Sequence, residues 1–206
     1  MSSSLRLPST SGGSVEPIVE GVRVRVAVYC SSSDAADEKY RQDAESLGTS
    51  IGQRGHELVY GGGNIGSMGV LAIAASKSGA RVVSVIPHFF NDQGLTYSAS
   101  DEILVTEDMQ QRKREMWERA DAAIALPGGY GTLEELTEIL VLNQLDLVEK
   151  PLVLANLDGF WDPLLQQFDQ MVSSKMTSLD HQRLVKVAPD GSSALSMLER
   201  MFKEDR

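Results

Sequence analysis

Short apolar runs alternate along this chain with longer segments of helical periodicity, and that alternation limits the possible folds more than any other feature. The first apolar run spans residues 23–29, and residues 35–54 after it repeat apolar side chains at helical spacing. Strands that alternate with helices form βαβ units, whose strands run parallel and whose helices cover both faces of the sheet. The pattern therefore predicts an α/β fold.

The alternation continues to the end of the chain, without an internal repeat or a linker that would separate two domains. We predict one doubly wound, Rossmann-like, nucleotide-binding domain over residues 21–206, with a mainly parallel sheet and right-handed crossovers. The predicted strands are 23–29, 57–60, 81–86, 102–105, 122–126, 151–155 and 184–187. The predicted helices are 35–54, 69–78, 109–119, 132–147, 163–173 and 192–203.

Composition narrows the class of protein further. The chain has 206 residues, a formal net charge of −10 and a single cysteine, Cys30. The negative charge disfavours nucleic acid as a partner. One cysteine cannot form a disulfide within the chain, so we expect a cytoplasmic protein. No apolar run reaches the roughly 18 residues that suggest a membrane span, and no membrane partner is expected.

Residues 1–20 differ in composition from the rest of the chain, because they are rich in Ser, Gly and Pro. They lack the apolar core of a secretory signal. We expect a disordered tail here. A targeting segment is the alternative, since Arg6 and many serines are present.

Glycine-rich loops follow two of the predicted strands. Gly61-Gly-Gly-Asn-Ile-Gly66 comes after the second strand, and Pro127-Gly-Gly-Tyr-Gly131 comes after the fifth. In doubly wound sheets, ligands bind at the carboxyl ends of the strands, near the point where the strand order reverses. The two loops therefore indicate a ligand site.

The first glycine loop has two interpretations. Gly62, Gly63 and Gly66 would allow backbone to approach a ligand closely, and the N–H groups at the start of the next helix would be free to bind an anion. A tight strand-to-helix turn is the alternative. The loop is not a P-loop, because the characteristic lysine followed by Ser or Thr is missing.

The second glycine loop predicts a phosphate site. Thr132 is a suitable N-cap for the helix that follows. Backbone N–H groups of the loop and the positive end of the helix dipole attract phosphate, and the Thr132 hydroxyl could donate as well.

Glu135 lies three residues after Thr132, and this spacing has two explanations. In a capping box, the carboxylate of Glu135 would accept a hydrogen bond from the backbone N–H of Thr132. Alternatively, a carboxylate in a ligand cleft is a candidate acid or base. With phosphate on the loop and Glu135 facing the sugar, the carboxylate could stabilise charge at the anomeric carbon or activate water. That arrangement favours cleavage of a glycosidic bond over phosphoryl transfer.

A basic run on the predicted helix 109–119 contains Arg112, Lys113 and Arg114. One interpretation is a solvated helix face, and the other is that Arg112 points inward with Met109 and Met116. The histidines and Cys30 show no metal-binding spacing, so no metal site is predicted.

Taken together, these residues resemble the LOG (Lonely Guy) family, the cytokinin riboside 5′-monophosphate phosphoribohydrolases, many of which carry the label lysine decarboxylase. The family pattern PGGxGTxxE corresponds to residues 127–135, and an upstream Arg-Lys pair corresponds to Arg112 and Lys113. The first glycine loop also matches, as Gly61-Gly-Gly-Asn-Ile-Gly-Ser-Met-Gly69. The resemblance covers residues from about Val24 to about Leu165.

The resemblance implies hydrolysis of the N-glycosidic bond, which gives free base and ribose 5-phosphate from a nucleoside 5′-monophosphate such as a cytokinin nucleotide or AMP. Arg112 and Glu135 would be the catalytic pair, no cofactor would be needed, and the chain would form a homodimer or a larger assembly. The substrate contacts expected from the resemblance and the loops are Lys113, Gly128, Gly129, Tyr130, Gly131, Thr132, Leu133, Glu134, Gly62, Gly63, Gly66 and Met109.

The sequence departs from the family pattern in three places. It has Cys30-Ser-Ser-Ser33 where the family often has Cys-Gly-Ser-Ser. Gly94 aligns with a substrate-binding Glu, and Val141 aligns with a Thr on the catalytic helix. These departures concern recognition of the base.

Two other functions compete with hydrolysis. A nucleotide carrier or sensor on the same fold would bind the monophosphate without releasing base. An oligomeric scaffold would use Glu135 only as a helix cap. A pyridoxal-dependent decarboxylase is disfavoured, because its Schiff-base lysine and cofactor-binding partners cannot be assigned.

Overall fold

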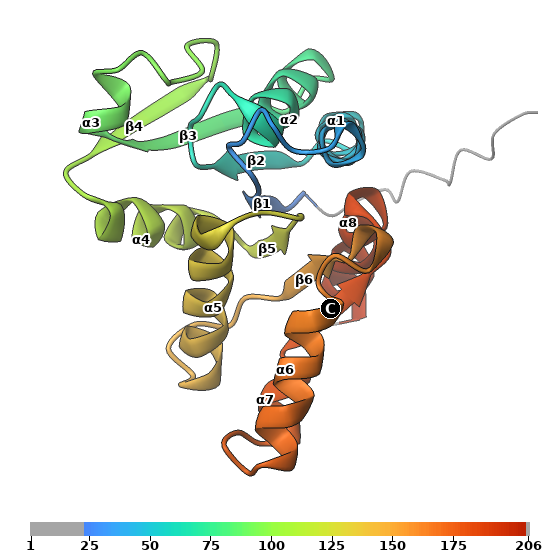
Figure 1. Ribbon diagram of the computed structural model, residues 1–206. Helices are drawn as coiled ribbons and strands as arrows, with labels where there is room; N and C mark the ends of the chain where they lie inside the picture. Colours follow the sequence, from blue (N-terminus) through green and yellow to red (C-terminus); the bar gives the residue numbers. More distant parts are fainter. Residues whose placement is uncertain (1–22, 205–206) are drawn as a thin grey trace, which may run out of the picture.

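The computed structural model describes residues 23–204, and the tail predicted at residues 1–20 lies outside them. Within the described residues, seven strands form one sheet in the order β4-β3-β2-β1-β5-β6-β7 (Figure 1). Every neighbouring pair of strands is parallel, which confirms the predicted α/β class. The strands are β1 (Arg25–Tyr29), β2 (Glu57–Tyr60), β3 (Arg81–Pro87), β4 (Glu102–Thr106), β5 (Ala122–Ala125), β6 (Leu152–Ala155) and β7 (Val185–Ala188).

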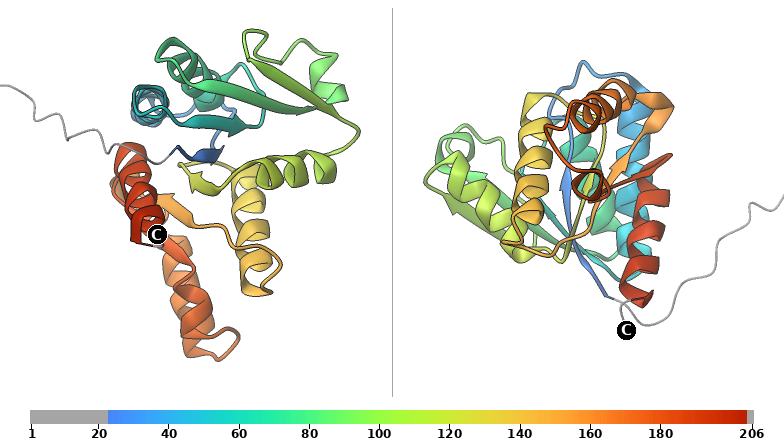
Figure 2. Two further views of the ribbon diagram at one scale, coloured as in Figure 1. Left: turned by 180° about the vertical axis from the view of Figure 1, so that it is seen from behind. Right: turned by 90° about the horizontal axis from the view of Figure 1, so that it is seen from below.

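Helices cover both faces of this sheet, as predicted for a doubly wound fold (Figure 2). α1 (Glu38–Gln53), α2 (Gly66–Lys77) and α8 (Gly191–Glu204) pack on one face. α4 (Met109–Arg119), α5 (Tyr130–Gln144) and α6 (Asp162–Ser173) pack on the other. The remaining elements are short: α3 (His88–Asn91), a 3₁₀ turn at Leu157–Gly159 and α7 (Leu179–Gln182).

Burial on both faces explains why the central strands are almost continuously apolar. Along β1, Val26 and Val28 face the core beneath α1, α2 and α8, whereas Ala27 and Tyr29 face the core beneath α4 and α5. All four side chains are almost completely buried. A strand with helices on both sides has no solvent face, so its sequence cannot alternate between apolar and polar residues.

The strand order reverses between β1 and β5. The chain leaves β1 towards β2 on one side, and β5 continues towards β6 on the other. The loops that follow β1 and β5 therefore meet at the carboxyl edge of the sheet, with the loop after β2 beside them. This is the position at which doubly wound proteins bind ligands.

Five of the six predicted helices begin one to three residues from the predicted start, and two of these differences bear on the site. α5 begins at Tyr130 with Gly129 as its N-cap, so the prediction that Thr132 is the N-cap is wrong. The backbone already becomes helical after Gly129, and Thr132 is a buried residue of the first turn. α2 begins at Gly66 rather than at residue 69. The short helices α3 and α7 were not predicted, since four residues show no periodicity.

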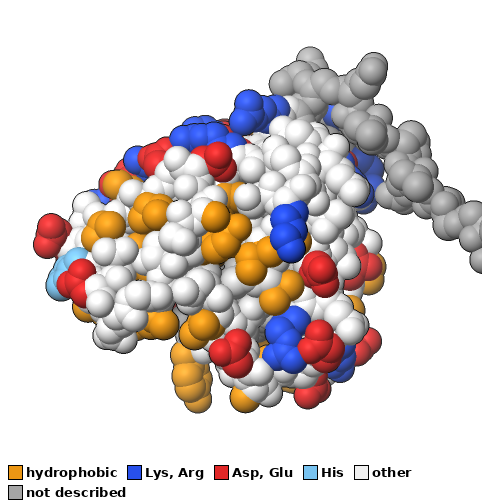
Figure 3. Space-filling view, turned by 90° about the horizontal axis from the view of Figure 1, so that it is seen from above, with side chains coloured by type: hydrophobic (Ala, Val, Ile, Leu, Met, Phe, Trp, Pro, Cys, Tyr) orange, Lys and Arg blue, Asp and Glu red, His pale blue; other side chains and the backbone are white. Residues whose placement is uncertain are grey.

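The excess of acidic residues does not gather into one patch on the face shown in Figure 3, where basic and acidic side chains both occur among apolar ones. No helix within residues 23–204 is long and apolar enough to cross a membrane. The same residues contain no cluster of three or more potential metal ligands among His, Cys, Asp and Glu.

Candidate active site

An ion pair between Arg112 of α4 and Glu135 of α5 lies at the carboxyl edge of the sheet. Nη1 of Arg112 is 2.7 Å from Oε1 of Glu135, and the two side chains are 9% and 7% exposed. Charged side chains are rarely buried this deeply, because removing an ion from water costs several kcal/mol. The attraction within a buried pair only roughly offsets that cost, so burial of the pair adds little net stability. A buried pair at a cleft is therefore a candidate for chemistry rather than for stability alone.

Arg112 is held by the ends of two strands as well as by Glu135. Its Nε donates to the carbonyl of Val85 in β3 at 3.3 Å, and Nη2 donates to the carbonyl of Gly61 after β2 at 3.4 Å. These bonds draw the side chain inward, so the interpretation of Arg112 as part of a solvated face is wrong. An arginine has more N–H donors than these three bonds use, so some remain for a ligand.

Gly61 leaves room for this guanidinium. A Cβ added at Gly61 would lie 1.8 Å from Nη2 and 2.9 Å from Cζ of Arg112. No larger residue fits at this position while Arg112 stays in place. The first glycine of the loop therefore shapes the site without itself needing to touch a ligand.

The start of α5 presents backbone donors to the same place. No side chain caps this helix, and the first N–H groups of a helix have no partner within it. Gly129, Tyr130, Gly131 and Thr132 all line one cleft, together with Arg112 and Glu135. An uncapped helix start at a cleft is a ready anion site.

The geometry excludes one of the two explanations for Glu135. Since Gly129 is the N-cap, the capping-box interpretation of the Thr132–Glu135 spacing is wrong. The carboxylate of Glu135 accepts a hydrogen bond from Arg112 instead. Glu135 lies one turn inside α5, on the side that faces the cleft.

The cleft has a volume of about 350 Å³, within the range of about 300–1,000 Å³ typical of small-molecule sites. Besides the residues above, its walls come from the loop after β1 and from three side chains of other elements. Those residues are Cys30, Ser31, Ser32, Ser33, Met68, Phe90 and Met109.

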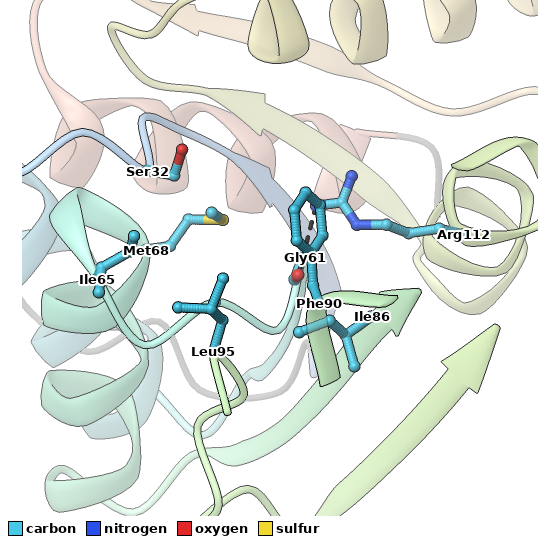
Figure 4. Close-up of a pocket in the computed structure, with 9 residues that line it drawn as sticks. Ser32, Gly61, Ile65, Met68, Ile86, Phe90, Leu95 and Arg112 are labelled. Carbon is cyan, nitrogen blue, oxygen red and sulfur yellow. Dashed lines mark hydrogen bonds between the residues drawn. The ribbon is translucent and has the colours of Figure 1, made fainter. Parts of the chain in front are cut away.

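A smaller and more apolar pocket of about 130 Å³ adjoins the cleft and shares Ser32, Met68, Phe90 and Arg112 with it. Figure 4 shows Arg112, Phe90 and Ile86 on one side of this pocket and Ile65, Met68 and Leu95 on the other. The cleft and the pocket together offer one polar and one apolar compartment, joined at Arg112.

Burial raises the pKa of Glu135 above its usual value, and the charge and hydrogen bond of Arg112 offset only part of that rise. Burial also raises the pKa of the neighbouring Tyr29 and Cys30, with the charge of Glu135 adding to the effect. Tyr29 and Cys30 therefore stay protonated near neutral pH, which makes Cys30 a poor nucleophile.

The other predicted contacts divide into two groups. Met109, Gly129, Tyr130, Gly131 and Thr132 line the cleft, and Gly63 lines the adjoining pocket. The remaining six line neither of them: Lys113, Gly128, Leu133, Glu134, Gly62 and Gly66.

Three of these six are engaged elsewhere. The N–H of Gly66 donates to the carboxylate of Asp34 at 2.8 Å, so this helix start is not free to bind an anion. A Cβ at Gly62 would meet Ile86 at 2.8 Å. Nζ of Lys113 is 2.8 Å from Oε1 of Glu134. Gly62 and Gly66 thus serve the strand-to-helix turn, whereas Gly61 and Gly63 of the same loop line the apolar pocket.

The departures from the LOG pattern lie at different distances from the site. Gly94 is in the turn just before Leu95, which lines the apolar pocket, and its φ is +73°. Val141 is half exposed and lines a separate groove between α5 and α6. Of these two, only Gly94 adjoins the residues that form the site, and Ser31, at the third departure, lines the cleft itself.

Sequence reasoning missed the apolar pocket. Ile65, Met68, Phe90 and Leu95 come from three separate segments, and each looks like an ordinary core or loop residue. The exposure of Ile65 and Phe90, both above one third, is visible only in the folded chain.

Solved structures of similar shape include a molybdenum cofactor carrier protein of Chlamydomonas reinhardtii. It has a TM-score of 0.65 and 21% identity, and the match covers 89% of this chain and 99% of that one. A molybdenum cofactor binding protein from Rippkaea orientalis has a TM-score of 0.66 and 22% identity over 88% of this chain and 98% of that one. At such identities the likeness concerns the fold alone.

Relatives of higher identity come from plants. The chain is 41% identical over 180 residues to the cytokinin riboside 5′-monophosphate phosphoribohydrolase LOG of Oryza sativa subsp. japonica, covering 87% of this chain and 74% of that protein. A phosphoribohydrolase with the same description in Arabidopsis thaliana is 39% identical over 175 residues, covering 85% and 82%.

A family model described as "Possible lysine decarboxylase" matches residues 68–198, which is more than half of the chain. With the plant relatives, this match shows that the chain belongs to the LOG family.

Proposed function

We propose that the protein hydrolyses the N-glycosidic bond of cytokinin riboside 5′-monophosphates and releases the free base and ribose 5-phosphate. The observation that carries the proposal is the buried Arg112–Glu135 pair on a cleft that also contains the uncapped start of α5. The plant relatives that are named for this activity support the same reaction.

The phosphate of the substrate would bind at the start of α5. Backbone N–H groups of residues 130–132 provide donors there, and the helix dipole adds positive potential. The acidic net charge of the chain does not prevent this, because a few local donors outweigh a diffuse field. A riboside without phosphate would lack this anchor.

Glu135 would act on the sugar, one helical turn beyond the phosphate. In the hydrolysis, the oxygen of water bonds to the anomeric carbon, and the bond between that carbon and the base nitrogen breaks. The bonding electrons go to the base, which ends with a proton from the water. An ionised Glu135 would stabilise the positive charge that develops on the sugar, or would accept the proton of the attacking water.

Arg112 and the apolar pocket would serve the base. The guanidinium lies where the cleft and the pocket meet, so its remaining donors can support the leaving base. The apolar side chains of Ile65, Phe90 and Leu95 offer a surface for an aromatic ring.

The decarboxylase description of the family is a poor guide to this site. A pyridoxal enzyme needs a lysine that forms a Schiff base with the cofactor. No lysine among the described residues lines the cleft or the apolar pocket.

The decisive experiment is chromatography of the products from three compounds: isopentenyladenine riboside 5′-monophosphate, AMP and the unphosphorylated isopentenyladenine riboside. We expect base release from the cytokinin monophosphate, with AMP as a second substrate, and little from the riboside. Equal rates with and without phosphate would contradict the phosphate anchor. Binding of the monophosphates without any base release would instead identify a nucleotide carrier or sensor.

We also propose that two copies of the chain form a homodimer in the cytoplasm. The homodimer follows from the family resemblance, and the cytoplasmic location follows from the single cysteine. Light scattering of the purified protein would measure the mass of the assembly, and fractionation of cells that express the full chain would test its location. A monomeric mass, or recovery with organelles, would contradict the respective part.

A further inference from the structure

Two neighbouring ion pairs join α4 to α5. Arg112 and Lys113 are consecutive on α4, and Glu135 and Glu134 are consecutive on α5. Arg112 pairs with Glu135 inside the cleft, whereas Lys113 pairs with Glu134 and, one turn further along α5, with Glu138. Because consecutive helical residues point about 100° apart, the second set lies outside the cleft.

Lys113 is a buried cation that the proposed chemistry does not use. Its side chain is 5% exposed, and its Nζ is 2.8 Å from Oε1 of Glu134 and 3.5 Å from Oε2 of Glu138. Burial alone would lower the pKa of Lys113, but the two carboxylates outweigh burial and raise it. The ammonium therefore stays charged and bound to α5.

Glu134 and Glu138 are four residues apart and share one side of α5. Like charges at this spacing repel one another and destabilise a helix. Lys113 lies between them and binds both, so it compensates the repulsion and ties the second and third turns of α5 to α4. Glu135 belongs to the same two turns.

We propose that Lys113 is a positioning residue, which holds the second and third turns of α5 against α4 through Glu134 and Glu138 so that Glu135 and Arg112 meet in the cleft. In this role Lys113 does not touch the substrate. The inference rests on the proposed function for its catalytic consequence, but the pairing itself can be tested independently.

Lys113 also affects the charge state of Glu135. The charge of Lys113 lowers the pKa of Glu135, and the charge of Glu134 raises it, although both effects are smaller than those of burial and of Arg112. The titratable and charged groups around Glu135 are thus Arg112 and Lys113 of α4, Glu134 and Glu138 of α5, and Tyr29 and Cys30 at the end of β1.

The test compares Lys113→Met with Lys113→Arg, which keeps the charge. Turnover of isopentenyladenine riboside 5′-monophosphate gives kcat and KM, calorimetry gives the Kd of AMP, and ¹³C NMR titration gives the pKa of Glu135, with Glu135→Gln to assign the signal. We expect Lys113→Met to lower kcat by about 10- to 100-fold, the scale of a small misplacement of a catalytic group. The pKa of Glu135 should rise, the Kd of AMP should stay unchanged, and Lys113→Arg should recover most of the activity.

A second variant, Glu134→Gln/Glu138→Gln, removes the partners and retains Lys113. We expect a loss of kcat with the pKa of Glu135 shifted downward, opposite to the shift in Lys113→Met. Since Glu134 is half exposed and Glu138 is partly exposed, this variant should fold even if Lys113→Met does not.

The proposal is overturned if Lys113→Met weakens AMP binding tenfold or more while kcat and the pKa of Glu135 stay unchanged, because Lys113 would then be a substrate ligand. Unchanged kcat in Glu134→Gln/Glu138→Gln would overturn it as well. If the wild-type protein releases no base, the proposed function fails. The opposite pKa shifts of Glu135 would still decide whether Lys113 acts on the Arg112–Glu135 pair.

Discussion

The α-carbon of Gly61 and the guanidinium of Arg112 occupy adjoining space, and a methyl group on Gly61 would lie 1.8 Å from Nη2. The carbonyl of the same glycine accepts a hydrogen bond from that nitrogen at 3.4 Å. Gly61 therefore both makes room for Arg112 and helps to hold it. Because the clashing atoms are at the far end of a flexible side chain, a larger residue would move Arg112 rather than unfold the protein.

We predict that Gly61→Ala lowers turnover by about 100-fold, since a displacement of about 1 Å in a catalytic site has that scale. The far-UV circular dichroism spectrum should match that of the wild type. Turnover by Gly61→Ala/Arg112→Ala should equal that of Arg112→Ala, because both changes act on one side chain. An additional loss in the double variant would mean that Gly61 acts on something other than Arg112.

Arg112→Ala should lower kcat/KM by about 100- to 1,000-fold, the range measured when one charge-stabilising donor is removed from an active site. Arg114→Ala is the matched control, since Arg114 is exposed on the same helix and should keep wild-type kinetics. Steady-state kinetics with isopentenyladenine riboside 5′-monophosphate provide the comparison. Equal activity in the two variants would remove Arg112 from the proposed mechanism.

Glu135→Gln should lower turnover by about 100- to 10,000-fold, the contribution typical of an acid or base in catalysis. AMP should still raise the melting temperature, because the phosphate site at the start of α5 is intact. Glu149→Gln, at an exposed glutamate beyond α5, is the control for the chemical change. Full activity of Glu135→Gln would contradict its catalytic role.

The activity should fall on the acidic side at a pH above the ordinary pKa of a glutamate. Glu135 must be ionised to act, and burial raises its pKa despite the opposing charge of Arg112. Lowering the pH through this raised pKa protonates the carboxylate and stops turnover. The profile of kcat/KM against pH measures this value for the free enzyme. A profile that stays flat down to pH 4 would exclude ionised Glu135 as the active form.

Glu199 should matter for stability rather than for activity. Its Oε1 is 2.8 Å from Nε2 of His56 and its Oε2 is 3.1 Å from Nη1 of Arg54, which attach α8 to the end of α1 and the start of β2. We expect Glu199→Ala to reduce the free energy of unfolding by about 2–4 kcal/mol, because buried partners lose their bonds. Urea denaturation would measure the loss. Asp180→Asn, in an exposed pair with Arg183, should change stability by less than about 0.5 kcal/mol.

The same carboxylate gives a pH dependence with a definite sign. Burial raises the pKa of Glu199, but the hydrogen bond from His56 and the charge of Arg54 outweigh it, and the pKa lies below its usual value. A carboxylate with a lowered pKa in the folded state contributes stability above its unfolded pKa and loses that contribution as the pH falls through the folded value. Wild type and Glu199→Gln should therefore differ less in stability below about pH 4. A difference that grows on acidification would contradict this assignment.

Most of the fold could be predicted because each helix and strand has a characteristic pattern of apolar residues in its own sequence. A strand buried on both faces must be apolar at every position, as in residues 26–29, and a helix between two strands repeats its apolar side chains about every 3.6 residues. The glycine loops at the strand ends could likewise be located from the residues next to them in the sequence. Element boundaries near glycine were less certain, because glycine permits both loop and helix, and the displaced starts of α2 and α5 lie beside such residues.

The roles of the site residues depended on contacts between distant parts of the chain. The spacing of Thr132 and Glu135 fitted both a capping box and a carboxylate in a ligand cleft, and the capping box is excluded only by the folded structure, in which Gly129 is the N-cap and Glu135 pairs with Arg112. In the same way, the sequence offered Lys113 as a substrate contact, whereas its nearest oxygens belong to Glu134 and Glu138.

The sequence by itself thus determined the α/β class, the parallel sheet and the two loops at its carboxyl edge, because local periodicity and backbone hydrogen bonding decide these. Tertiary structure alone decided which charged side chains meet, which glycines face the cleft and where the apolar pocket lies. Those features follow from the reversal of strand order between β1 and β5 and from the contact of α4 with α5, which bring together residues that no local pattern connects.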